Sequence, residues 1–196
     1  MSCERHGTDL NRNYDYLWGQ EKKYTSSDPC SDQYFGPSVF SEVESSNVRD
    51  FVLLHKDKIM FFQSIHSYSQ FILIPGNLTH APSAAVTALA NKGNDALRAV
   101  NGEDYEVGCI PCLLYEVTGD SLNWAYWTVG IPYAYTFELR PKQRNANGYN
   151  FVLPRGQIIP TAKETWAWHE VAARQIIEEF GNDCSPLPTL PNILYF

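Results

Sequence analysis

Apolar and polar positions along the chain follow two different periods, which predict helices and strands in alternation. A capping box at residues 41–44 is followed by apolar positions at helical spacing, which predict a helix to about residue 57. A second helix is predicted behind Pro82. The most strongly patterned helix is predicted to begin at a capping box over residues 161–164 and to end at Gly181. Its expected inward positions are Trp168, Val171, Ala172, Ile176 and Phe180.

Four other stretches have the short apolar runs or the alternation of strands. They are residues 59–66, 71–74, 105–115 and 133–139. Because strands and helices alternate, we expect an α/β fold with a mixed, largely parallel sheet flanked by helices. The first 38 residues are polar and rich in turn signals, and the tail from residue 183 is expected to lie extended over the surface.

Length and composition indicate one globular domain over residues 1–196. The hydrophobic share of 44% and the charged share of 19% are ordinary for a globular protein and exclude a disordered chain. With a net charge of −7 and no basic patch, the chain is not expected to bind nucleic acid. No apolar run approaches the length of a membrane span, and residues 1–10 are too polar for a signal peptide, so neither is predicted.

The five cysteines include one CxxC motif, Cys109 and Cys112. A zinc knuckle is disfavoured because no second pair follows at a suitable distance. A thioredoxin-like site would need a helix after the first cysteine, whereas both flanks look like strand. We therefore favour a structural or incidental pair over a redox site, and the pairing of these two cysteines and Cys184 stays open.

Three motifs together resemble the signatures of one enzyme family. Residues 9–13 read DLNRN, residues 66–70 read HSYSQ and residues 136–140 read TFELR. Two further stretches, around residues 27–37 and 153–165, agree in order and spacing. Over nearly the whole chain, the sequence resembles the zinc carboxypeptidases of the pancreatic A/B type. The resemblance implies the zinc carboxypeptidase fold, one zinc ion in the complete enzyme, peptide or protein C-termini as substrates, and secretion.

By this resemblance His66 is a zinc ligand and Glu138 is the general base. A neutral imidazole suits zinc, and a carboxylate beside a metal-bound water can accept its proton. The residues themselves also allow purely structural interpretations. A lone histidine is commonly a hydrogen-bonded core residue, and Glu138 could simply form an ion pair with Arg140.

The resemblance also implies a clamp for the C-terminal carboxylate of the substrate, formed by Asn11, Arg12 and Tyr115. A guanidinium matches a carboxylate with two hydrogen bonds. Ser67 and Tyr68 of the HSYSQ motif are further candidates for substrate contacts. From the residues alone, Arg12 could instead be a solvated surface residue, and Tyr115 could serve packing only.

The remaining implied positions concern specificity and support. Leu122 corresponds to the base of the specificity pocket, and its apolar side chain favours hydrophobic or aromatic C-terminal residues. Further positions implied by the resemblance are Ile110 and Leu114 in the pocket wall, Asp9 as the carboxylate that orients a zinc-binding histidine, and a disulfide between Cys3 and Cys30.

One signature of the family is absent. Its HxxE motif supplies two zinc ligands, yet none of the five histidines has a glutamate three residues later. We therefore expect an N-terminally incomplete catalytic domain: a fragment, an incomplete gene model or a truncated isoform. The leading hypothesis is a metallocarboxypeptidase that is inactive as this chain stands. The alternatives are a non-catalytic module that binds C-terminal carboxylates, and a chain that does not fold stably alone because its sheet has an open edge.

Overall fold

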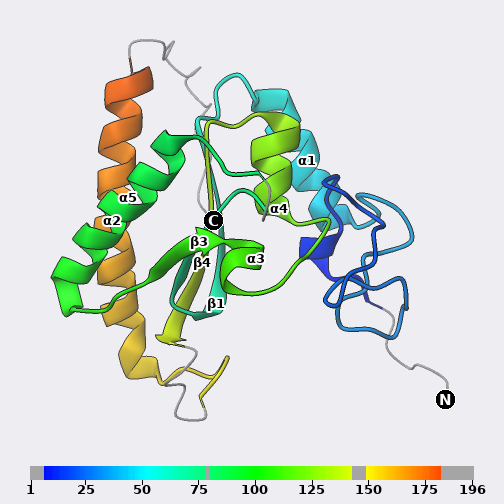
Figure 1. Ribbon diagram of the computed structural model, residues 1–196, viewed down its shortest axis with the longest axis horizontal. Helices are drawn as coiled ribbons and strands as arrows, with labels where there is room; N and C mark the ends of the chain where they lie inside the picture. The colour runs from blue at the N-terminus through cyan, green and yellow to red at the C-terminus, as the bar shows by residue number, and fades with distance from the viewer. Residues whose placement is uncertain (1–6, 78–79, 143–148, 182–196) are drawn as a thin grey trace, which may run out of the picture.

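The structure is a computed structural model that describes residues 7–77, 80–142 and 149–181. At its centre lies a four-stranded sheet with the strand order β1-β4-β2-β3 (Figure 1). β1 runs parallel to β4 and β2 runs parallel to β3, whereas β2 and β4 are antiparallel. The strands are β1 (Phe61–Ser69), β2 (Phe71–Ile74), β3 (Glu106–Cys109) and β4 (Tyr133–Lys142). The expected mixed, largely parallel α/β sheet is thereby confirmed.

Two long helices, α2 (Ala84–Asn101) and α5 (Ile158–Phe180), cover one face of this sheet. Trp168 of α5 is fully buried against Tyr135 and Phe137 of β4, as the helical pattern predicted. Gly93 of α2 allows the close approach, because a Cβ there would lie 2.3 Å from Nε1 of Trp168. The aromatic layer between α5 and the sheet therefore fixes both helices in place.

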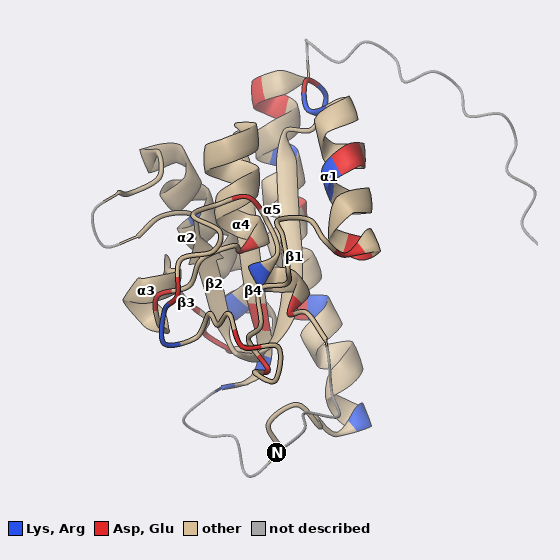
Figure 2. Cartoon of the chain, turned by 90° about the vertical axis from the view of Figure 1, so that its right-hand side faces the viewer, with Lys and Arg blue, Asp and Glu red and all other residues tan. Residues whose placement is uncertain are grey.

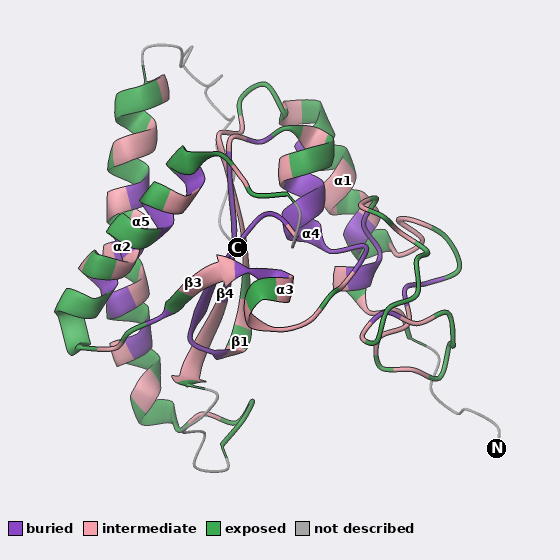
Figure 3. Ribbon diagram, in the orientation of Figure 1, coloured by how far each residue is buried: buried purple, intermediate pink, exposed green. Residues whose placement is uncertain are grey.

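Shorter elements cover the opposite face. They are α1 (Val43–His55), α4 (Ser121–Asn123) and the π-helix η2 (Trp124–Val129). Val52 of α1 and Trp124 belong to the buried cluster on this side, which also contains Leu73 of β2. Figure 3 shows buried positions on the strands and on the inward sides of the helices on both faces. The outer side of α1 carries both acidic and basic positions (Figure 2). No helix in the described part of the chain is long and apolar enough to cross a membrane.

The N-terminal segment forms irregular loops beside this second face, with one short 3₁₀-helix, η1 (Leu10–Arg12). Asn13 anchors the segment from within. Its amide nitrogen donates to the backbone oxygens of Phe35 and Ser38 at 2.9 Å each, and its side-chain oxygen accepts from Ser45 at 2.6 Å. A second 3₁₀-helix, η4 (Arg155–Gln157), leads directly into α5.

Three local predictions are wrong. The strand expected over residues 105–115 ends at Cys109, and a short helix, α3 (Ile110–Leu113), follows with a proline in its first turn. The capping box at residues 41–44 does not form, because α1 is preceded by Glu42 without a side-chain cap and Ser41 bonds to Asn13 and Glu42 instead. The capping box at residues 161–164 lies inside α5, which begins three residues earlier. The predicted extended tail from residue 183 lies outside the described residues.

Candidate active site

A cavity of about 270 Å³ lies where the carboxyl ends of β1 and β4 meet the loop that carries η1. His66 of β1 and Glu138 of β4 are partners in the parallel register, so their side chains project from the same face. The cavity brings together nine predicted residues that are far apart in the sequence. They are Asp9, Asn11, Arg12, His66, Ser67, Ile110, Leu114, Tyr115 and Glu138.

Arg12 is a buried cation of this cavity, contrary to the alternative of a solvated surface arginine. Its Nε donates to the backbone oxygen of Tyr24 and one terminal nitrogen donates to that of Asn11, both at 2.8 Å. Asp9 lies 3.9 Å from the same guanidinium. The backbone contacts fix the plane of the guanidinium, and they leave its other terminal nitrogen without a hydrogen bond to any described residue.

Asn11 and Asp9 are held by hydrogen bonds at η1, one of them local and two of them to α4. Asp9 caps η1 by accepting from the backbone N–H of Asn11 at 3.0 Å. The side-chain oxygen of Asn11 accepts from the N–H and the hydroxyl of Ser121, at 2.9 Å each. These bonds tie η1 to the start of α4, so the loop that carries Arg12 is positioned by the sheet-covering elements.

Glu138 is a largely buried carboxyl beside this cation. Burial raises the pKa of Glu138 to about 7, and the positive charge of Arg12 opposes that rise. The ion pair considered between Glu138 and Arg140 is not found, because Arg140 pairs with Glu164 and Glu103 on another side of the sheet. Glu138 can therefore exchange a proton near neutral pH without breaking an ion pair to Arg140.

His66 of β1 lies beside Glu138 of β4 in the parallel register of the two strands. Its Nε2 lies 2.7 Å from the hydroxyl of Ser64. Burial lowers the pKa of His66, while the negative charge of Asp9 acts in the opposite direction. The imidazole is therefore largely neutral at pH 7, which is the form that can ligate a metal. Among the described residues, no group of three or more His, Cys, Asp or Glu side chains is arranged to hold a metal ion.

Tyr115 closes one side of the cavity. Its ring stacks on that of Tyr24 with 3.9 Å between centroids. Tyr24 also provides the carbonyl that accepts from Arg12, so the positions of Tyr115 and the guanidinium are coupled through one residue.

The apolar wall differs partly from the prediction. Ile110 and Leu114 line the cavity, together with Leu73 of β2. Leu122 does not line it; this side chain is buried in the adjacent core cluster with Ile110 and Leu73. Leu122 thus supports the wall from behind.

Sequence reasoning missed four lining residues: Leu73, Val117, Thr136 and Phe151. Thr136 lies two residues before Glu138 on β4, so strand alternation could have placed it on the same face. Its buried hydroxyl has no hydrogen-bond partner in the described structure. Tyr68 is not a lining residue, but its ring packs edge-on against Phe151 at 5.1 Å.

The CxxC motif forms a disulfide between Cys109 and Cys112, with Cα atoms 4.9 Å apart. A helix does follow Cys109, contrary to the expected strand, but it spans only four residues. Cys109 is buried and Cys112 is exposed. The disulfide joins the end of β3 to α3, which carries Ile110, so it braces the cavity wall. Cys30 is also disulfide-bonded, whereas Cys3 lies outside the described residues, so the predicted pairing of these two stays a prediction.

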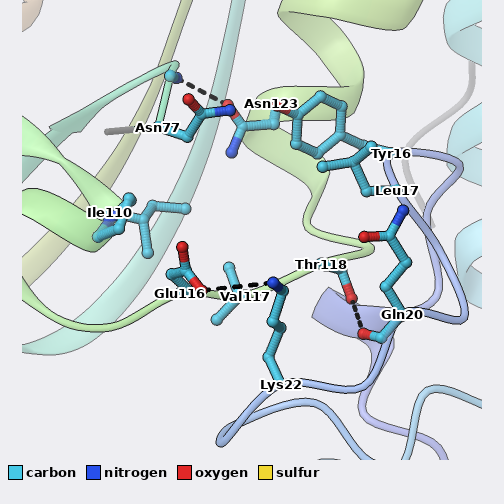
Figure 4. Close-up of a pocket in the computed structure, with 12 residues that line it drawn as sticks. Tyr16, Leu17, Gln20, Lys22, Asn77, Ile110, Glu116, Val117, Thr118 and Asn123 are labelled. Atoms are coloured by element: carbon cyan, nitrogen blue, oxygen red, sulfur yellow. Dashed lines mark hydrogen bonds and ion pairs between the residues drawn. The ribbon is translucent and has the colours of Figure 1, made fainter. Parts of the chain in front are cut away.

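A second cavity of about 210 Å³ lies behind this wall (Figure 4). It shares Ile110 and Val117 with the first cavity. Lys22 and Glu116 form an ion pair of 3.4 Å at its border, and Asn123 accepts from the N–H of Gly76 at 2.8 Å. The segment from α3 to residue 118 therefore contributes lining residues to both cavities.

Comparisons with known proteins agree with the fold and the motifs. The family model "zinc carboxypeptidase" matches residues 2–168. Carboxypeptidase B of Astacus astacus is 40% identical over 184 residues, covering 92% of this chain and 58% of that protein. Bovine carboxypeptidase A1 is 43% identical over 163 residues, covering 82% of this chain and 37% of that protein.

A solved structure of bovine thrombin-activatable fibrinolysis inhibitor, in complex with tick carboxypeptidase inhibitor, superposes with a TM-score of 0.78. It is 33% identical, and the match covers 88% of this chain and 58% of that one. The chain thus spans well under two thirds of the length of these relatives. By its matched model, its identity to these relatives and its fold, the chain belongs to the zinc carboxypeptidase family.

Proposed function

We propose that the chain is a large part of the catalytic domain of a metallocarboxypeptidase, which removes C-terminal residues from peptides and proteins. The observation that carries this proposal is one cavity that contains a buried guanidinium, a tyrosine and a carboxyl group with a near-neutral pKa. Carboxypeptidases must recognise a free carboxylate and also transfer a proton. These residues supply both functions.

Arg12, Asn11 and Tyr115 are proposed to bind the terminal carboxylate of the substrate. The terminal nitrogen of Arg12 that has no partner among described residues can donate to one carboxylate oxygen. Since the guanidinium is buried and fixed by backbone carbonyls, little side-chain entropy is lost when the carboxylate binds. Tyr115 can donate its hydroxyl to the same group.

Glu138 is proposed to act as the general base. With a pKa of about 7, its carboxylate is half ionised at neutral pH. It can accept a proton from the attacking water and return it to the leaving amine. The neighbouring charge of Arg12 keeps the ionised form accessible in a buried site.

The family implies a zinc ion, and catalytic zinc sites use three protein ligands. The described residues do not fit such a site, because His66 has no second and third ligand among them. We therefore propose one zinc ion only for the complete enzyme, with His66 as one ligand and Asp9 as the carboxylate that orients a ligand. The remaining ligands come from outside this part of the chain.

The substrate side chain is proposed to be hydrophobic or aromatic. The wall offered by Leu73, Ile110 and Leu114 is apolar and is supported by the buried Leu122. A charged terminal side chain would lose its hydration there without gaining an ionic partner. The disulfides at Cys30 and Cys109–Cys112 support the proposal of secretion, because such bonds persist in oxidising compartments.

A non-catalytic module that binds C-terminal carboxylates is the second candidate. It is favoured by one observation: Asn11, Arg12 and Tyr115, which are proposed to bind the carboxylate, line one cavity, whereas no group of three metal-ligating side chains is found among the described residues. The two candidates share the same ligand chemistry and differ only in hydrolysis.

A binding experiment tests the shared part of both candidates. Fluorescent peptides that end in Phe, Lys or Glu are titrated with the chain, each with a free and with an amidated C-terminus. We expect the free Phe peptide to bind at least tenfold more tightly than its amide and than the Lys and Glu peptides. Equal affinity for acid and amide would refute the carboxylate site, and a preference for Lys or Glu would refute the assignment of the apolar wall.

A further inference from the structure

A tight turn of the N-terminal segment lies against the loop that follows α3. Lys22 and Thr25 exchange backbone hydrogen bonds of 3.1 Å in both directions, so Lys23 and Tyr24 form the two-residue tip of the turn. The ring of Tyr24 stacks on that of Tyr115, with 3.9 Å between the centroids and 29° between the planes. This aromatic contact joins two loops that are far apart in the sequence.

Other contacts hold the same two loops together without the aromatic rings. The buried hydroxyl of Thr25 accepts from the N–H of Thr118 at 3.3 Å, and the hydroxyl of Thr118 donates to the carbonyl of Gln20 at 2.8 Å (Figure 4). The ion pair between Lys22 and Glu116 is exposed and contributes little. Since the threonine contacts are independent of the ring at the tip, the turn keeps its place when that ring is removed.

Tyr24 contacts the candidate site only through other residues. Its carbonyl oxygen accepts from Nε of Arg12 at 2.8 Å, and its ring contacts Tyr115. Arg12 and Tyr115 line the cavity, whereas Tyr24 does not. The ammonium of Lys23 lies 5.0 Å from the centre of the Tyr24 ring, and the attraction between a cation and a ring favours this orientation of the side chain.

We propose that Tyr24 is a positioning residue of the carboxylate site, which orders Tyr115 and Arg12 before a peptide binds. This inference rests on the proposed function. A side chain that is already ordered loses less conformational entropy when its ligand arrives. The ring of Tyr24 orders Tyr115 by stacking, and the carbonyl of Tyr24 orders the guanidinium of Arg12 by a hydrogen bond. Because a substitution changes the ring and keeps the carbonyl, the two effects can be separated.

The test compares the affinity for a fluorescent peptide with a free C-terminal Phe and for its amide. Tyr24→Ala should weaken binding of the free acid about fivefold, because one aromatic stack is lost, and should change binding of the amide less than twofold. Tyr24→Phe keeps the ring and should restore the affinity to within twofold. Tyr34→Ala is the matched control and should change both affinities less than twofold. Tyr34 is a half-buried tyrosine of the same segment that stacks on Phe35 and does not line the cavity.

A double-mutant cycle with Tyr115→Phe measures whether Tyr24 acts through Tyr115. In the unsubstituted chain, Tyr115→Phe removes the hydroxyl and should weaken binding of the free acid about fivefold. In the Tyr24→Ala variant, the same substitution should weaken binding less than twofold, because the hydroxyl is no longer held at the carboxylate. Equal losses in both backgrounds would overturn the proposal, and so would a failure of Tyr24→Phe to restore the affinity.

A spectroscopic measurement without peptide separates this proposal from the proposed function. In NMR spectra of the chain with ¹³C-labelled tyrosine rings, the signals of Tyr115 are identified by their loss in Tyr115→Phe. We expect these signals to be shifted by the stacked ring and to move towards those of free tyrosine in Tyr24→Ala, but not in Tyr34→Ala. Unchanged Tyr115 signals in Tyr24→Ala would overturn the proposal. Equal affinity of the unsubstituted chain for acid and amide would refute the carboxylate site itself, and the ring signals would still decide whether Tyr24 holds Tyr115.

Discussion

Gly119→Ala should damage the carboxylate site through the backbone of Arg12. Gly119 has a φ of +73°, and a Cβ at this position would lie 2.1 Å from the carbonyl oxygen of Arg12. The backbone of Gly119 also bonds to Tyr14 and Tyr16, at 2.9 and 2.7 Å, which holds the two segments together. An alanine therefore requires the Arg12 carbonyl to move by about 1 Å to reach even a tight contact.

Gly102→Ala provides the matched control. Gly102 has nearly the same φ, +77°, but open space at the position of a Cβ. The left-handed conformation alone should reduce the free energy of unfolding by about 1–2 kcal/mol in both variants. The clash should add about 2 kcal/mol or more in Gly119→Ala, comparable to other overpacking substitutions.

Urea denaturation of the two variants measures this difference, and titration with a peptide that has a free C-terminal Phe measures the site. We expect Gly119→Ala to weaken peptide binding at least tenfold and Gly102→Ala to leave it unchanged. Equal losses of stability in the two variants, with equal affinity for the peptide, would refute the reasoning that Gly119 positions Arg12.

Three further predictions concern single charges. Arg12→Lys should weaken binding of the free-carboxylate peptide about tenfold, since an ammonium lacks the planar fork, and should not change binding of the amide. Glu164→Gln should lower the free energy of unfolding by about 3 kcal/mol in urea denaturation, because Glu164 is fully buried against the guanidinium of Arg140; an effect below 1 kcal/mol would contradict this. Burial raises the pKa of Glu138 from its ordinary value of 4.5 to about 7 in the folded chain, so its contribution to stability is complete below pH 4.5 and is lost as the pH rises to about 7. Between pH 4.5 and 7, the free energy of unfolding should therefore decline by about 3 kcal/mol less in Glu138→Gln than in the unsubstituted chain. The same decline in both proteins would show that the pKa of Glu138 is not raised.

Local periodicity predicted the elements whose residues pack in the way their sequence pattern indicates. β2, β4 and α5 are examples, since the apolar positions of the two strands and the predicted inward positions of α5 reach one of the two cores. The pattern failed at residues 110–113, because a short apolar run is compatible with a strand and with a helix. The disulfide between Cys109 and Cys112 also joins the two ends of this turn. It also failed at both capping boxes, because Ser41 and Glu164 have long-range partners that no local pattern reveals.

The residues of the candidate site were predicted from the sequence motifs more than from the hydrophobic periodicity. Resemblance indicated Arg12, His66 and Glu138, and the structure places them around one cavity. The burial of Arg12 could not be read from a polar, turn-rich segment, because it depends on carbonyl groups of Asn11 and Tyr24 that only the folded loop brings together. Leu122 was predicted at the base of the specificity pocket; in the structure it is buried in the core cluster with Ile110 and Leu73 and does not line the cavity.

We propose that the catalytic centre of this chain is incomplete. Measuring the zinc content and the activity of the chain by itself tests this most directly. The chain is dialysed against zinc, the bound metal is measured, and release of Phe from a blocked dipeptide is followed. We expect well below one zinc ion per chain and no measurable turnover, because no group of three ligating side chains that includes His66 is found among the described residues. One tightly bound zinc ion per chain, with turnover that disappears in Glu138→Gln, would contradict this and would show that other residues of the chain complete the site.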